Sequence, residues 1–141
     1  MGSWNVLDAI AIADCALEIH GRDLDDLFAT AARALADVMV DPDTVSRDVE
    51  RTLLLRARAL DLLLHEWLSE LIFLKDTERL VLPEAFVSVR AAPAELTARL
   101  RGGRIDPART ALRADPKAVT FHQFTVEPRA DSWYARVVID I

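Results

Sequence analysis

The sequence predicts an α+β fold in which two helices pack on one face of a mostly antiparallel β-sheet. Two stretches of the chain carry apolar residues at helical spacing, and several others alternate apolar and polar residues as strands do. The last four expected strands follow one another with short links, which favours antiparallel pairing. The predicted order is β-α-β-α-β-β-β-β, in a single domain that covers residues 1–141.

Composition excludes several classes of protein. The chain has 141 residues, of which 52% are hydrophobic and 28% charged, as in a globular domain. Its net charge of −6 argues against a broad basic surface, so we expect no high-affinity binding of nucleic acid. The single cysteine, Cys15, excludes an internal disulfide and is expected to be a small buried apolar residue. No apolar stretch approaches the ~20 residues of a membrane span, so we expect a soluble, cytoplasmic protein.

In the first half of the chain we expect two strands and two helices. Residues 8–20 are apolar and end at Gly21, which predicts a strand that contains Asp14. Asp23 is the expected N-cap of a helix of about 16 residues. Residues 49–58 alternate between apolar and polar and predict a second strand. A second helix is predicted to follow it.

The second helix and the last four strands follow. Asp61 is the expected cap of that helix, and Trp67 is expected to be among the most buried residues. The predicted strands form two hairpins, which comprise residues 84–90 with 95–101 and residues 117–127 with 132–140. The long connection 102–116 is of the kind that is usually functional or mobile.

Established catalytic motifs are absent, but two aspartates are in unusual places. The chain has no phosphate-binding glycine loop, no Gly-x-Ser-x-Gly and no His-x-x-x-His. Asp14 is flanked by apolar residues, and Asp140 ends an apolar strand beside the carboxylate of Ile141. Carboxylates this close repel unless a cation lies between them, and Ca²⁺ and Mg²⁺ prefer such oxygen ligands. The alternatives are a capping or ion-paired Asp14 and a solvated terminus at Asp140.

Lys117 and His122 are two further candidates. They lie in the strand-like segment Lys-Ala-Val-Thr-Phe-His-Gln-Phe. Regular alternation places them on opposite faces, so a site that uses both needs a bulge or a strand end. The alternatives are a solvated lysine at the strand start and a histidine that is simply hydrogen-bonded.

Taken in order, these segments resemble the archease family. The family's His-Thr-Ala-Asp stretch, which runs on to a glycine, corresponds to residues 11–21, and its Leu-Leu-x-x-Trp-Leu-x-Glu-Leu segment with Asp-Thr-Glu to residues 63–78. Its Asp-Pro corresponds to residues 106–107, and its Lys-Ala-Val-Thr-Tyr-His to residues 117–122, with phenylalanine for tyrosine. The final Asp-Ile is at residues 140–141. The resemblance covers nearly the whole chain.

The resemblance implies a function. Archeases are small cytoplasmic accessory proteins, not enzymes, that activate the RtcB-type RNA ligase of tRNA splicing and RNA repair by promoting its guanylation and multiple turnover. By resemblance, Asp14, Asp140 and the terminal Ile141 bind a divalent metal ion, Ca²⁺ or Mg²⁺. Lys117 belongs to the functional patch around that metal, and we add His122 to the same patch. No membrane is involved.

The chain also departs from the family pattern. Ala11 and Ile12 replace the histidine and threonine before the aspartate, and Ala16 replaces the glycine after it. Loss of a histidine that orients a metal ligand is expected to weaken metal binding about 10–100-fold. Pro116, where the family has valine, is expected to re-aim Lys117.

Two other classes of protein remain open. One is a metal-dependent enzyme that acts on a small phosphorylated substrate, with Lys117 and His122 lining a pocket beside the metal. The other is a general chaperone or assembly factor without a metal, which an exposed apolar patch would favour.

Overall fold

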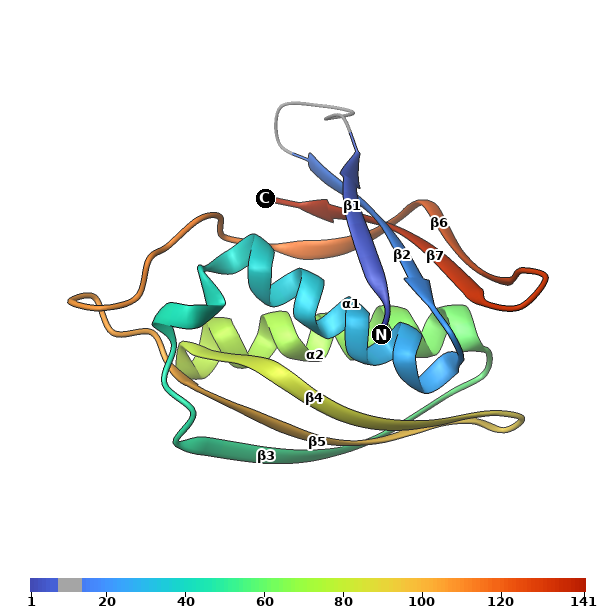
Figure 1. Ribbon diagram of the computed structural model, residues 1–141, viewed down its shortest axis with the longest axis horizontal. Helices are drawn as coiled ribbons and strands as arrows, with labels where there is room; N and C mark the ends of the chain where they lie inside the picture. The colour runs from blue at the N-terminus through green and yellow to red at the C-terminus, as the bar shows by residue number, and fades with distance from the viewer. Residues whose placement is uncertain (8–13) are drawn as a thin grey trace.

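The computed structural model describes residues 1–7 and 14–141. It has three layers, in which two helices lie between two antiparallel β-sheets (Figure 1). The predicted α+β class, with two helices and antiparallel strands, is confirmed. The strands, however, are divided between two sheets, so the helices are covered on both sides.

The first sheet has four strands in the order β1-β2-β7-β6, and every neighbouring pair is antiparallel. Its strands are β1 (Ser3–Leu7), β2 (Asp14–Gly21), β7 (Trp133–Asp140) and β6 (Ala118–Pro128). The N-terminal strand β1 was not predicted. Asp14 lies at the first position of β2, and residues 8–13 of the predicted strand are outside the described residues.

The second sheet has three strands in the order β3-β5-β4, again antiparallel throughout. Its strands are β3 (Val49–Ala57), β4 (Leu80–Ala91) and β5 (Ala94–Arg104). The predicted hairpin between β4 and β5 is confirmed, and both strands extend beyond their predicted limits. The 3₁₀ turn η1 (Pro42–Thr44) precedes β3.

Helix α1 (Leu24–Met39) begins as the sequence predicts. The Asp23 side chain is its N-cap and accepts a hydrogen bond of 2.8 Å from the backbone N–H of Asp26. The Asp26 carboxylate turns back to accept hydrogen bonds from the backbone N–H groups of Gly2 and Arg22. The start of the helix is thereby tied to the first residues of the chain.

Helix α2 (Leu60–Glu78) is capped differently from the prediction. Its N-cap is Ala59, which makes no side-chain cap hydrogen bond. Asp61 lies in the first turn, where its carboxylate accepts a hydrogen bond from the N–H of Leu62. The prediction that Asp61 caps the helix is therefore wrong, because the helix begins one residue before it.

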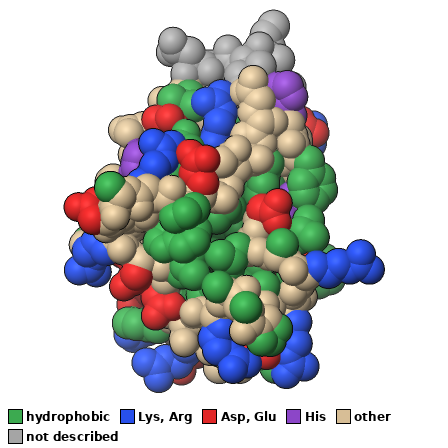
Figure 2. All heavy atoms as spheres, turned by 90° about the vertical axis from the view of Figure 1, so that its right-hand side faces the viewer, with side chains coloured by type: hydrophobic (Ala, Val, Ile, Leu, Met, Phe, Trp, Pro, Cys, Tyr) green, Lys and Arg blue, Asp and Glu red, His purple; other side chains and the backbone are tan. Residues whose placement is uncertain are grey.

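The core explains why two sheets are needed. Both helices have buried side chains around much of their circumference, and Trp67 is fully buried, as predicted. One sheet can cover only one face of a helix, whereas both helices contact strands of both sheets. Figure 2 shows hydrophobic side chains gathered between the sheets, at the end of the molecule where the β4–β5 and β6–β7 turns lie. No helix among the described residues is long and apolar enough to cross a membrane.

Candidate functional site

Asp14 and Asp140 occupy directly opposed positions in β2 and β7. Residues paired in this way project from the same face of a sheet, with Cα atoms roughly 4.5–5.5 Å apart. Their neighbours Cys15 and Ile139 pack toward the core, so both carboxylates lie on the outer face of the four-stranded sheet. The fold thus brings together two aspartates that are separated by nearly the whole length of the chain.

The C-terminal residue adds a third carboxylate where the start of β2 meets the end of β7. We call Asp14, Asp140 and the Ile141 terminus the acidic corner. The Ile141 side chain packs against the core, which anchors the terminal carboxylate next to Asp140. Within the described chain, neither aspartate forms an ion pair with a lysine or arginine. Like charges directly opposed in a sheet are destabilising, and a cation between them would relieve the repulsion.

These groups fit a hard divalent cation, because every one of them is a carboxylate oxygen donor. The described residues hold no group of three or more His, Cys, Asp and Glu side chains arranged around a metal position. The expected ligands of a cation at this corner are Asp14, Asp140 and the Ile141 terminus, which are two side-chain carboxylates and one main-chain carboxylate.

Lys117 lies at the same corner. Its backbone N–H donates a hydrogen bond of 2.7 Å to the carbonyl oxygen of Asp140. The next residue, Ala118, opens β6 and is the register partner of Asp140. The lysine therefore lies one residue before the strand that it was predicted to open, and its backbone is fixed to the end of β7 that carries the second aspartate.

A buried lysine holds the segment before β6 in place. Lys75, from α2, donates hydrogen bonds to the Asp115 carboxylate and to the carbonyl oxygen of Pro116, the latter at 2.8 Å. It also forms an ion pair of 2.7 Å with Asp76. Its side chain is 8% exposed, so these contacts fix residues 115–116, directly before Lys117. This contact was not predicted from the sequence.

The hydrogen bonds of this cluster shift two pKa values. The Lys75 hydrogen bond, more than the nearby charges of Lys75 and Lys117, lowers the pKa of the Asp115 carboxyl. Burial acts to lower the pKa of Lys75, but its carboxylate partners outweigh burial and raise that pKa. Both residues are therefore held in their charged forms at neutral pH.

His122 lies apart from this corner. The register between β6 and β7 shifts between Thr120 and Thr125, so residues 121–124 form a bulge. The His122 side chain is exposed on this bulge, and its backbone N–H donates to the Thr120 hydroxyl at 3.2 Å. Among the described contacts, none joins His122 to Lys117 or to either aspartate of the corner.

Helix α2 fixes the base of the bulge through His65. The ring Nε2 of His65 lies 2.8 Å from the carbonyl oxygen of Val119, to which it donates. The same ring stacks on Phe121 with centroids 4.0 Å apart and an interplanar angle of 7°. Phe124 meets the His65 ring edge-on. These contacts give His65 a structural role in holding the bulge against α2.

Arg136 is a charged residue on the same outer face that the sequence analysis did not select. It is the register partner of Glu18 and donates a hydrogen bond of 2.7 Å to the Gln123 side chain in the bulge. Gln123 has a φ of 52°, a left-handed conformation that is uncommon outside glycine. The Nε of Arg136 is buried without a hydrogen-bond partner in the described structure, which is unusual for a polar atom. The alternation of β7, which places Arg136 on the same face as Asp140 and four residues before it, was the available signal.

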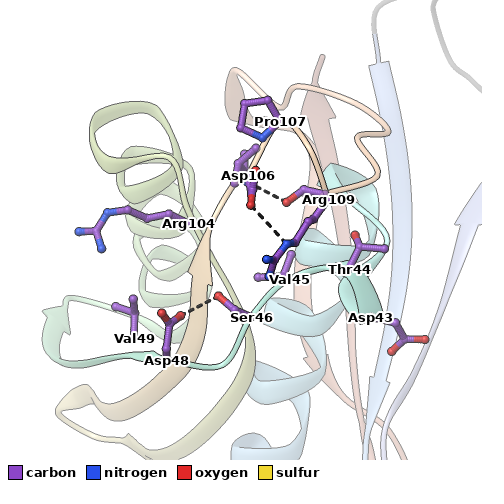
Figure 3. A pocket seen from close by; sticks show the side chains of 12 residues that line it. Asp43, Thr44, Val45, Ser46, Asp48, Val49, Arg104, Asp106, Pro107 and Arg109 are labelled. Atoms are coloured by element: carbon purple, nitrogen blue, oxygen red, sulfur yellow. Dashed lines mark hydrogen bonds and ion pairs between the residues drawn. The ribbon is translucent and has the colours of Figure 1, made fainter.

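A polar hollow of about 780 Å³ lies between the connection from β5 to β6 and the segment that leads into β3 (Figure 3). One acidic and one basic side chain of its lining pair with each other, and another carboxylate accepts a hydrogen bond from a serine. Asp106 forms an ion pair of 3.7 Å with Arg109, and the Ser46 hydroxyl donates to Asp48 at 2.6 Å. Lys117 and His122 are not among its lining residues. The predicted long connection thus forms a wall of this hollow.

Three residues that the sequence singled out remain, namely Ala11, Ile12 and Cys15. The family histidine and threonine positions, Ala11 and Ile12, lie outside the described residues. Cys15 packs partly against the core, and burial raises the pKa of its thiol. A thiol in this environment is a poor nucleophile and a poor metal ligand, in agreement with its expected apolar role.

Comparison with known families and sequences gives a consistent result. The model of the Archease protein family (MTH1598/TM1083) matches residues 4–141. The archease of Methanosarcina barkeri is 33% identical over 132 residues, which cover 92% of this chain and 90% of that protein. The archease of Archaeoglobus fulgidus is 34% identical over 130 residues, with coverage of 92% and 93%.

Solved structures have the same fold. The solution structure of protein 1598 of Methanobacterium thermoautotrophicum matches with a TM-score of 0.79 and 29% identity, over 98% of both chains. The crystal structure of a Thermotoga maritima archease, described as a possible chaperone, matches with a TM-score of 0.68. That protein is 20% identical over 93% of both chains, so it supports the fold alone.

Proposed function

Because the chain belongs to the archease family, we propose that it is a cytoplasmic accessory protein that activates an RtcB-type RNA ligase. As the family resemblance implies, it promotes guanylation of the ligase and its multiple turnover in tRNA splicing or RNA repair. It is not itself the enzyme. The observation that carries the proposal is the direct pairing of Asp14 with Asp140 beside the C-terminal carboxylate.

Each group at this corner has a role in the proposal. Asp14, Asp140 and the Ile141 terminus hold a divalent cation, which supplies positive charge for binding and orienting phosphate or carboxylate groups. Lys117 presents a second positive charge beside it, and its backbone position is fixed by the hydrogen bond to Asp140. The corner lies on the outer face of the sheet, where a partner protein can approach it.

The test measures turnover by the cognate ligase. The ligase is given GTP, a divalent metal ion and RNA ends that carry a 2′,3′-cyclic phosphate and a 5′-hydroxyl, with and without this protein. We expect more than one joined RNA per ligase only when the protein is present, and no joining by the protein alone. Asp140→Ala should abolish the stimulation, and Lys117→Ala should weaken it.

A matched control separates this corner from acidity in general. Asp43→Ala removes an exposed carboxylate at the polar hollow of Figure 3 and should stimulate as the wild type does. If the wild type gives no stimulation, the ligase proposal is wrong. If Asp140→Ala stimulates fully, the proposed role of the acidic corner is wrong.

A chaperone role is the second candidate. It is favoured by the description of the Thermotoga maritima archease and by two large apolar side chains, Leu54 and Phe86, that are 54% and 57% exposed. In this case the protein should suppress aggregation of an unfolded client equally well with Asp140→Ala. Loss of that activity in Phe86→Ser alone would favour this candidate over ligase activation.

A further inference from the structure

The three-stranded sheet is the bottom layer in Figure 1, and no helix or strand of the described residues packs on its outer face. The strand register arranges its side chains in four cross-strand rows, each with one residue from β3, β5 and β4. The rows are Glu50–Arg101–Glu84, Thr52–Arg99–Phe86, Leu54–Thr97–Ser88 and Arg56–Glu95–Arg90. We call this set of residues the outer β3-β5-β4 face.

Apart from Arg99, the charges of this face lie in its two end rows, and the two end rows have opposite charge order. The first row reads Glu-Arg-Glu and the fourth reads Arg-Glu-Arg. In the fourth row, Glu95 pairs with Arg56 at 2.8 Å and with Arg90 at 3.0 Å. Figure 2 shows basic side chains along the lower edge of the molecule, where this sheet lies.

The two middle rows are neutral apart from Arg99 and contain the exposed apolar groups. Leu54 and Phe86 are both more than half exposed, and the guanidinium of Arg99 lies 5.2 Å from the centre of the Phe86 ring. Together with Thr52, Thr97 and Ser88 they surround a shallow depression. An apolar centre between charged ends is the usual anatomy of a protein–protein interface.

We infer that this face is the interface of a homodimer, in which a second copy of the chain stacks face to face with its strands running in the opposite direction. A two-fold axis across the strands places the first row of one copy against the fourth row of the other. Glutamate then faces arginine, or arginine faces glutamate, in all three columns. A two-fold axis along the strands would instead place like charges together at every end position.

The sizes of the middle side chains agree with the same arrangement. The second row of one copy faces the third row of the other, so each large side chain faces a smaller one. Phe86 faces Ser88 of the second copy, Leu54 faces Thr52, and Arg99 faces Thr97. Interlocking of large and small side chains is how two sheets pack about 10 Å apart.

The dimer is expected to be weak and sensitive to salt. By strand rise and spacing, the face measures roughly 27 Å by 14 Å. Two such faces come to about 750 Å², which is below the ~1,200 Å² at which stable specific interfaces begin. The end contacts are exposed ion pairs, which salt screens.

The test uses two single substitutions in one column. Arg56→Glu places a carboxylate opposite Glu50 of the second copy, and Glu50→Arg places a guanidinium opposite Arg56. Each variant repels its own copy, at both symmetry-related contacts. In a mixture of the two variants, every one of these contacts joins opposite charges, so we expect a heterodimer where each variant alone is monomeric.

The measurement is sedimentation velocity over a roughly hundred-fold range of concentration, because mass action makes the dimer fraction depend on concentration. The wild type should dimerise, and each variant alone should dissociate about tenfold or more readily. Arg109→Glu, which makes the same change in net charge as Arg56→Glu at a side chain 84% exposed on the β5–β6 connection, should dimerise like the wild type. Circular dichroism spectra and melting temperatures identify any variant that fails to fold.

These outcomes test the homodimer independently of the proposed activation of the ligase. A wild type that stays monomeric at every concentration overturns the inference and leaves the face free for a different protein. Dimers that persist in both variants place the interface elsewhere and also overturn it. Recovery of a dimer only on mixing Arg56→Glu with Glu50→Arg supports the antiparallel stacking, since no other arrangement restores both contacts.

Discussion

Asp14, the first residue of β2, is the direct register partner of Asp140, the last residue of β7. The pairing joins the two ends of the chain in the middle of the four-stranded sheet and opposes two carboxylates. The repulsion between them destabilises the folded state. The first two predictions below test whether a cation offsets it.

Addition of Ca²⁺ or Mg²⁺ should raise the melting temperature of the wild type, because a ligand that binds only the folded state stabilises it. Asp140→Asn should remove most of that rise. In the presence of a chelator the same variant should be more stable than the wild type by about 0.2–1 kcal/mol, because it removes a like-charge pair. Thermal melts of both proteins, with metal and with chelator, check this. Equal metal-induced shifts in the two proteins would contradict a cation between Asp14 and Asp140.

The position of the terminal carboxylate should matter separately from the side chain of Ile141. Extension of the chain by one glycine keeps the apolar side chain on the core but moves the carboxylate away from Asp140. We expect metal affinity, measured by isothermal titration calorimetry, to fall about tenfold or more, as on loss of a contact that orients a metal site. The melting temperature without metal should stay unchanged. Unaltered affinity would remove the terminus from the proposed ligand set.

Trp67→Ala should destabilise the fold by roughly 3–5 kcal/mol, because the side chain is fully buried between the sheets. The Trp67 indole N–H also donates a hydrogen bond of 2.9 Å to the carbonyl oxygen of Phe28, which joins the two helices. Trp67→Phe keeps an aromatic ring and should cost less, about 1–3 kcal/mol. Urea unfolding followed by circular dichroism gives both values. A cost below about 1 kcal/mol for Trp67→Ala would contradict the central packing of α2.

Stability should depend on pH through Lys75 and Asp115. The pKa of Asp115 is lowered below 3.8, so its contribution is present above that pH and is lost as pH falls through the lowered pKa. The pKa of Lys75 is raised above 10.5, so its contribution is present below that pH and is lost as pH rises through the raised pKa. Asp115→Asn should therefore destabilise the protein at neutral pH, and its difference from the wild type should shrink in acid.

Urea unfolding at several pH values measures this difference. Lys75→Met removes the shared partner, so Asp115→Asn should have little further effect in that background. A difference between Asp115→Asn and the wild type that is the same at pH 7 and at about pH 3 would contradict the assignment.

Local patterns predicted most of the fold. The Asp23 cap and the apolar stripe that follows it placed α1 within one residue, and the alternation of residues 49–58 predicted β3 to within one residue. These signals are local, since a cap or an alternating strand depends on neighbours within a few residues. Asp61 was misassigned as a cap because an aspartate in the first turn has the same sequence signal as an aspartate just before it.

The candidate site was predictable only in part. An acidic residue in each of two apolar segments marked Asp14 and Asp140, and the family resemblance linked them. Lys75 was not found, because a lysine on a helix is usually solvated, and its partners Asp115 and Pro116 are about 40 residues away in the sequence. The bulge at residues 121–124 was also missed, because a register shift is set by the partner strand.

The sequence by itself determined both helices and the order of the elements that follow β1, because alternation and helical spacing are properties of the chain alone. Only the tertiary structure decided how the strands divide into two sheets, since two helices with apolar residues around much of their surface require cover on both sides. It also decided that Asp14 faces Asp140 and that the outer β3-β5-β4 face has oppositely ordered charges at its ends. These arrangements depend on the register between distant strands, which is fixed by packing of the whole core rather than by any one segment.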